Sequence, residues 1–193
     1  MSKQRLMMIT VFLVLFVNGL GLDLLFTVLD TLLLDVDIGF LTFVTNESTL
    51  IQIYGVTVGI FMLSWFVGAF VLSAWSDKVG RKKALIFCLL GSFVGFLVTS
   101  IAVYYLSFTL LILGRVINGF TAGSQPISQA IAIDLSTKQS RPYYIGYVVL
   151  AIMLGIIGGP ILADLLSDPN IVTWFNYQTP FYFAAAFSLM NII

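Results

Sequence analysis

The residues that could do chemistry in this chain are a few charged and amide side chains that interrupt long apolar segments. Arg115 lies inside an apolar run, and Asn118, Ala122, Gln125 and Gln129 follow it at helical spacing. At 100° per residue, these five positions fall within an arc of about 80° and form a polar stripe on one helix face. An ionised arginine at mid-membrane costs at least about 3 kcal/mol, so it requires a wet cavity or an acidic partner. The stripe predicts a solute or proton pathway, with hydrogen bonds between packed helices as the alternative.

Two acids in the first apolar segment are candidates for binding a proton. Asp23 and Asp30 are seven residues apart and share a helix face with Thr27 between them. Counted from Leu6 at 1.5 Å per residue, Asp23 lies about 25 Å and Asp30 about 36 Å along the helix. We therefore expect Asp23 inside the membrane and Asp30 near its outer surface. The alternatives are an acid satisfied by a neighbouring helix for Asp23 and a solvated interface for Asp30.

The composition indicates which elements must position these residues. Of the 193 residues, 60% are apolar and 9% are charged, whereas soluble domains carry about a quarter charged residues. The chain has no histidine and one cysteine, Cys88, and its formal net charge is zero. These counts argue against enzymes that use a histidine base, against a disulfide framework and against a nucleic-acid partner. We expect a membrane protein that is not an enzyme; an unusual Ser-Lys or di-aspartate site is the remaining enzyme alternative.

Six apolar segments predict an all-α polytopic membrane protein with one domain over residues 1–193. The predicted spans are 6–34, 51–76, 84–105, 108–133, 143–166 and 179–193. The last is shorter than a hydrocarbon core of about 30 Å requires, so we expect a truncated span and a longer natural protein. Eight of the nine basic residues flank the spans on one side, which predicts a cytoplasmic amino terminus.

The turn between the second and third segments carries a charged motif, S-A-W-S-D-K-V-G-R-K-K over residues 73–83. Gly80 can adopt the positive φ of a tight turn, while Asp77 and Arg81 can pair with neighbouring helix ends. This motif resembles the signature G-x-x-x-D-[RK]-x-G-[RK]-[RK] of the major facilitator superfamily, with Ser73 in place of the first glycine. An ordinary basic cytoplasmic loop is the alternative.

The fourth segment resembles the same family. Arg115, Asn118 and Gly119 match its R-x-x-Q-G motif, with asparagine in the glutamine position. Asp134 and Arg141 resemble the acid and base on either side of the family's next loop. We expect Asp134 to pair with Arg81 or Arg141; solvated loop charges are the alternative.

The fifth segment resembles the family's antiporter signature G-x8-G-x3-G-P-x-x-G-G. The matching residues are Gly146, Gly155, Gly159 and Pro160, whereas alanine and aspartate replace the closing glycines. Small residues every four positions allow a neighbouring helix to approach closely, and Pro160 removes a backbone hydrogen bond and is expected to bend the span. A plain packing face is the alternative.

The first segment is similar to the pattern D-x-x-G-x-G…P-x-x-P of drug-efflux members of the family. Asn18 replaces the acid, Asp23 replaces a glycine, and Thr27 and Asp30 stand where prolines are common. If proton coupling is retained, its acid has moved, which favours Asp23.

Together these resemblances imply one half of a major-facilitator fold, formed by six transmembrane helices. They imply proton-coupled antiport, or efflux, of a small organic or drug-like compound by alternating access. The proton gradient supplies the energy and no cofactor is expected. The implied partners are the substrate, the lipid bilayer and a second six-helix half from the same full-length chain or from a second copy. The short amino terminus favours the bacterial inner membrane. The alternatives are a proton-coupled symporter for uptake and a non-transporting fragment.

The resemblance also implies roles for single residues. Asp23 and Arg115 are expected to face each other or share waters in the central cavity, where Asp23 would carry the proton. Asn118, Gln125 and Gln129 would offer hydrogen bonds to the substrate. Charge pairs at the cytoplasmic ends would hold the inner side closed; their residues are Asp77, Arg81 and Asp134.

Overall fold

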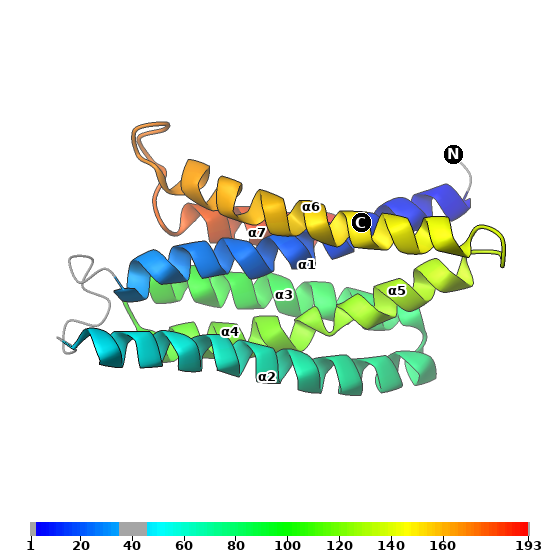
Figure 1. Ribbon diagram of the computed structural model, residues 1–193, viewed down its shortest axis with the longest axis horizontal. Coiled ribbons are helices and arrows are strands. Elements are labelled where there is room, and N and C mark those ends of the chain that lie inside the picture. Colours follow the sequence, from blue (N-terminus) through cyan, green and yellow to red (C-terminus); the bar gives the residue numbers. More distant parts are fainter. Residues whose placement is uncertain (1–2, 35–45, 193) are drawn as a thin grey trace.

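The computed structural model describes residues 3–34 and 46–192, and these residues form helices joined by short turns, without a strand. The helices run up and down along one long axis (Figure 1). Their bounds are α1 (Lys3–Leu34), α2 (Glu47–Val79), α3 (Arg81–Tyr104), α4 (Phe108–Ala122), α5 (Ser124–Asp134), α6 (Arg141–Ser167) and α7 (Thr179–Met190). Residue 193, the end of the last predicted span, lies outside the described residues.

Local sequence signals account for the boundaries of α2. Asn46 caps its first turn, because the side-chain oxygen accepts a hydrogen bond from the Ser48 backbone N–H at 3.0 Å. Gly80 separates α2 from α3 with φ +94°, a conformation that glycine adopts without a steric penalty. The positive φ predicted for this turn is therefore confirmed.

Within the predicted span 108–133, the helix is interrupted at one residue, Gly123, between α4 and α5. Pro126 has no backbone N–H to donate to the carbonyl of Ala122, and its ring disfavours a helical turn before it. Accordingly α4 ends at Ala122, and the Gly123 N–H donates to the Phe120 carbonyl at 3.2 Å. Figure 1 shows α5 continuing past this break toward the end of the bundle where α6 begins.

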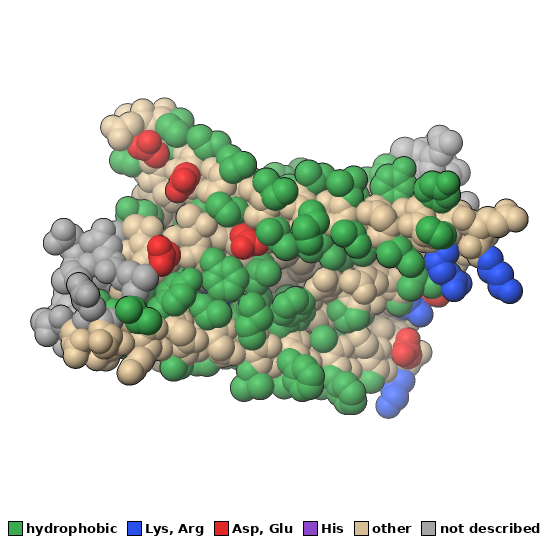
Figure 2. Space-filling view, in the orientation of Figure 1, with side chains coloured by type: hydrophobic (Ala, Val, Ile, Leu, Met, Phe, Trp, Pro, Cys, Tyr) green, Lys and Arg blue, Asp and Glu red, His purple; other side chains and the backbone are tan. Residues whose placement is uncertain are grey.

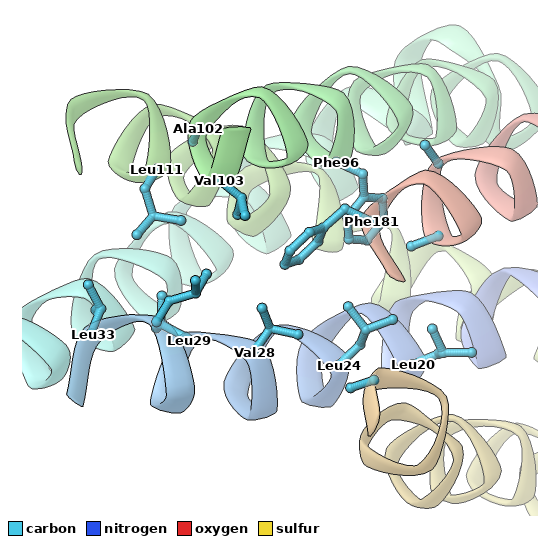
Figure 3. Close-up of a cluster of buried hydrophobic side chains, with 14 of the residues drawn as sticks. Leu20, Leu24, Val28, Leu29, Leu33, Phe96, Ala102, Val103, Leu111 and Phe181 are labelled. Atoms are coloured by element: carbon cyan, nitrogen blue, oxygen red, sulfur yellow. The ribbon is translucent and has the colours of Figure 1, made fainter. Parts of the chain in front are cut away.

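The core lies where one face of α1 meets α3, α4 and α7. Figure 3 shows Leu24, Val28 and Leu29 of α1 directed toward Phe96, Val103 and Phe181 of neighbouring helices. Each of these side chains is at most 6% exposed. Burial of large aliphatic and aromatic side chains contributes about 1.5–3 kcal/mol each, so this cluster fixes α1 in the centre of the bundle.

Within the described residues, four helices are long and apolar enough to cross a membrane: α1, α2, α3 and α6. The break shortens α4 and α5, and α7 is a shorter apolar helix. Of the four, α2 and α6 are the most outward-facing. Figure 2 shows hydrophobic side chains over the long surface and Lys and Arg side chains gathered at one end. The Lys and Arg residues of the two turns after α2 and α5 lie at this end, which we call the basic end: Lys78, Arg81, Lys82, Lys83, Lys138 and Arg141.

Candidate functional site

A cavity of about 70 Å³ lies between α1, α2, α6 and the junction of α4 with α5. Two amides, Asn18 and Gln125, provide polar groups in its wall, and the remaining lining is mostly apolar. Pockets for drug-sized ligands have volumes of about 300–1,000 Å³. This cavity by itself is therefore smaller than a site for a drug-sized ligand. The apolar lining includes Leu15, Leu22, Phe61, Trp65, Ile152 and Ile156.

Asn18 links α1 to the helix break. Its side-chain N–H donates to the Ser124 hydroxyl at 2.8 Å, and Ser124 is the first residue of α5. The sequence showed only that Asn18 stands where drug-efflux members of the family have an acid, and it did not predict the bond to Ser124. That replacement of an acid by an amide is the feature of the sequence that could have pointed to a polar contact here.

Arg115 is fully buried, with 0% of its surface exposed. Its guanidinium carbon lies 4.5 Å from the ring centroid of Phe61 and 5.7 Å from that of Phe26. The nitrogens Nε, Nη1 and Nη2 have no hydrogen-bond partner among the described residues. Tyr54 of α2 lies within electrostatic range of both Arg115 and Asp30. The sequence singled out Arg115, whereas its aromatic neighbours come from two other helices and were missed.

Asp23 lies at the interface of α1 with α6. A Cβ added at Gly159 would stand 2.9 Å from the Asp23 Cβ, so the two backbones are in close contact there. The Oδ2 atom of Asp23 is buried without a hydrogen-bond partner. Among the described residues, the structure records no direct ion pair between Asp23 and Arg115; that the two face each other or share waters stays a prediction. Asp30, expected near the outer surface, is exposed.

The predicted polar stripe is divided by the helix break. Asn118 faces α3, where a Cβ added at Gly95 would collide with its Oδ1 atom. Both polar atoms of the buried Asn118 side chain lack partners within the described part of the chain. Gln125, on the other side of the break, lines the cavity, whereas Gln129 is half-buried and does not line it. Ala122, which precedes the break, lines the same cavity as Gln125, so part of the stripe keeps a common face across the break.

The basic end contains an ion pair between two helices. Arg81 Nε, at the start of α3, lies 3.2 Å from Asp134 Oδ2, at the end of α5. Of the two partners expected for Asp134, the structure pairs it with Arg81. Arg141 is exposed in the first turn of α6, and Asp77 is exposed in the last turn of α2.

The glycines of α6 allow the closest approach between α1 and α6. A Cβ at Gly155 would collide with the Phe16 carbonyl oxygen, and a Cβ at Gly159 would lie 2.8 Å from the Leu24 backbone nitrogen. Gly19 approaches from the other side, because its Cβ would lie 2.7 Å from the Ile152 carbonyl oxygen. α6 continues as one helix through Pro160. The region described contains no group of three Cys, Asp or Glu side chains that could hold a metal ion.

Comparison with known proteins places this geometry in a family. The family model described as Major Facilitator Superfamily matches residues 11–193. The tetracycline resistance protein, class H, of Pasteurella multocida is 30% identical over 177 residues, which are 92% of this chain and 40% of that protein. A probable triacylglyceride transporter of Mycobacterium bovis is 33% identical over 132 residues, 65% of this chain and 26% of that protein.

A solved structure shares the fold. The human organic anion transporter MFSD10 (TETRAN) superposes with a TM-score of 0.75 at 24% identity, covering 100% of this chain and 46% of that chain. The chain thus spans less than half the length of these relatives. From the helical bundle, the charged turn after α2 and the matched residues, we conclude that the chain belongs to the Major Facilitator Superfamily and corresponds to an N-terminal half of its fold.

Proposed function

We propose that this chain forms the N-terminal half of a proton-coupled antiporter that exports a small organic or drug-like compound by alternating access. The observation that carries the proposal is Asp23, which is partly buried and whose Oδ2 atom is buried without a partner beside Gly159 of the antiporter-like segment. An ionised carboxylate in such a place is costly. Movement of α6 that admits water would therefore change whether Asp23 holds a proton.

The packing of α1 against α6 supports alternating access. At Gly19, Gly155 and Gly159 the two backbones approach each other closely, because small residues keep bulky side chains out of the interface, and we propose that α1 and α6 move against each other there. At the basic end, the pair between Arg81 and Asp134 would hold the inner side closed. Asp77 is exposed at the end of α2 and would be available to a helix of the second half.

The second six-helix half would complete the substrate site. The cavity of about 70 Å³ is too small for a drug-like molecule, and in this architecture substrate sites lie between the two halves. Intact mass spectrometry of the natural protein, extracted from its membrane, distinguishes a second half in the same chain from a pair of identical copies. The gathered Lys and Arg side chains support a cytoplasmic basic end, and we propose the bacterial inner membrane as the location.

The proposed substrate class is supported by the names of the relatives, which include tetracycline resistance proteins and a probable triacylglyceride transporter. These names indicate movement of organic compounds out of a cell or across its membrane. Tetracycline is therefore the first probe.

The test is proton-driven accumulation of tetracycline in everted membrane vesicles that contain the natural full-length protein. Imposing an outward proton gradient, with an acidic vesicle lumen, should drive accumulation, because tetracycline enters as protons leave, and a protonophore should abolish it. Asp23→Asn should remove the dependence on the gradient, whereas Asp164→Asn, an exposed acid on α6, should leave it intact.

Two outcomes would contradict the proposal. Gradient-driven accumulation that survives Asp23→Asn would remove Asp23 as the proton carrier. Uptake by right-side-out vesicles, driven by an inward gradient, would identify a symporter instead.

A further inference from the structure

Among the described residues, the guanidinium group of Arg115 is buried without the hydrogen-bond partners that such a group requires. Its side chain is 0% exposed, and Nε, Nη1 and Nη2 have no hydrogen-bond partner among the described residues. Arginine does not lose its proton in proteins, so five N–H donors and a full positive charge remain to be satisfied. The faces of Phe61 and Phe26 attract the charge, but an aromatic face cannot satisfy donors that lie in the guanidinium plane.

The acids of the neighbouring helix do not supply the missing partner. Asp23 lies against Gly159 at the interface of α1 with α6, and Asp30 is exposed. Tyr54 lies within electrostatic range of Arg115, but a phenol hydroxyl is uncharged at neutral pH. The site therefore has a buried cation and unused donors in fixed positions, which is the chemistry that recognises a carboxylate or a similar planar oxyanion.

Phe61 separates this cation from the cavity. Its ring covers the guanidinium at 4.5 Å, and the same residue belongs to the cavity wall together with Trp65. The backbone of Phe61 is held in place, because a Cβ added at Gly119 would lie 2.6 Å from the Phe61 carbonyl oxygen. Rotation of the Phe61 side chain is therefore the simplest movement that opens Arg115 to the cavity, and it requires no displacement of α2.

We infer that Arg115 and Phe61 form an anion-accepting subsite, in which a ligand's carboxylate displaces the Phe61 ring and pairs with the guanidinium. The apolar body of the ligand lies in the cavity, against Leu22 and Trp65. The ligand class is an amphipathic organic acid. This inference rests on the proposed function in that it names the class of compound that the transport site accepts.

The test measures binding through the fluorescence of Trp65, which lines the cavity. The natural full-length protein is placed in lipid nanodiscs after substituting every other tryptophan, including Trp75 and Trp174, with phenylalanine. The probes are 4-butylbenzoate and its uncharged analogue 4-butylbenzamide, with empty nanodiscs as the blank for partitioning into lipid.

We expect the benzoate to shift Trp65 emission saturably, with a Kd at least about tenfold below that of the benzamide, as a charge-assisted hydrogen bond provides. Arg115→Gln should remove this discrimination while benzamide binding persists. If Arg115→Gln does not fold, Arg115→Lys supplies the same comparison: it keeps the charge without the planar fork and should retain only part of the discrimination.

A second variant tests the Phe61 ring independently. Phe61→Ala removes the group that the carboxylate must displace and should tighten benzoate binding more than benzamide binding. Phe66→Ala, an exposed phenylalanine on the same helix with 72% of its surface exposed, is the matched control and should change neither.

Equal affinity for the two probes in the unsubstituted chain would overturn the inference, and so would discrimination that survives Arg115→Gln. These failures are distinguishable from failure of the proposed function. Loss of discrimination with intact proton-driven export of tetracycline rejects the subsite alone. Selective benzoate binding without proton-driven export supports the subsite and rejects the transport proposal.

Discussion

Two arginines in this bundle occupy opposite environments. Arg81 lies at the basic end, where its side chain is 32% exposed and pairs with Asp134 at 3.2 Å. Arg115 lies in the middle of the bundle, fully buried, with aromatic rings beside it and no hydrogen-bond partner in the part of the chain described.

Arg81 is partly exposed to water and also has an ion-pair partner in the protein. Arg115, which water does not reach, depends more on such a partner. Water can solvate Arg81 if its pair breaks, whereas nothing replaces a partner for Arg115. An unpaired buried charge reduces stability, so the folding of this chain alone gives no reason for Arg115. The difference teaches that Arg81 has one ion-pair partner and only its Nη1 atom buried without a hydrogen bond, whereas all three guanidinium nitrogens of Arg115 lack a partner within the described residues.

The largest expected change in stability comes from replacing Arg115 by an apolar side chain of similar length. Arg115→Met removes a charge whose placement in a membrane interior costs about 3 kcal/mol, so the free energy of unfolding should rise by up to about that amount. Binding of 4-butylbenzoate should lose its advantage over the benzamide. Unfolding of the purified protein in detergent, followed by circular dichroism, measures the stability change.

Arg141→Met is the control at the basic end. Arg141 is exposed, and surface substitutions usually change stability by less than about 0.5 kcal/mol. A destabilised Arg115→Met variant would mean that Arg115 has a structural partner after all, and the contrast between the two regions would fail.

A second pair of substitutions compares the basic end with the buried middle on one helix, because α6 runs from one to the other. Gly159→Ala should lower the free energy of unfolding by about 1–3 kcal/mol, since the added Cβ would meet the Leu24 backbone and overpack the interface. Proton-driven transport should fall as well, because Asp23 is in contact at the same position. Chemical denaturation and the vesicle assay report the two effects.

Gly146→Ala is the matched change near the basic end. Nothing lies within 4 Å of a Cβ built at Gly146, so the better helix propensity of alanine should raise stability by about 0.5–1 kcal/mol. If Gly146→Ala and Gly159→Ala change the free energy of unfolding by the same amount, the close approach of α1 to α6 at Gly159 does not determine the stability of this interface.

The smallest expected effect concerns the pair at the basic end. A double-mutant cycle with Arg81→Gln and Asp134→Asn should give a coupling of about 0.5 kcal/mol, because both side chains are partly exposed. Raising the salt concentration should reduce it. A coupling above about 2 kcal/mol that does not depend on salt would show that the pair at this end is shielded from water, as Arg115 is in the middle of the bundle.

The features that follow from composition and local spacing could be predicted from the sequence. The helical membrane architecture depends on runs of apolar residues, and the turn at Gly80 depends on a single glycine between two helices; both are present in the structure. The family assignment also follows from motifs within single segments, and the family comparison confirms it.

The contacts between helices could not be predicted in the same way. The sequence gives no rotation of α2 about its axis, so it does not reveal that Phe61 covers Arg115 or that Tyr54 lies near it. Whether Asp23 and Arg115 share waters depends on the same helix rotations and stays a prediction. The break at Gly123 is a different case, because Pro126 is visible in the sequence and its missing N–H predicts an interruption one turn earlier.

That break gives the bundle a mechanical property. α5 is about 16 Å long at 1.5 Å per residue, so a tilt of about 10° at the break would move its far end by about 3 Å. Asp134 stands at that far end, in contact with Arg81, and Ser124 at the near end is bonded to Asn18 beside the cavity. α5 would thus act as a lever with its pivot at the cavity wall, and a small change in the cavity would be enlarged into the making or breaking of the salt bridge at the basic end.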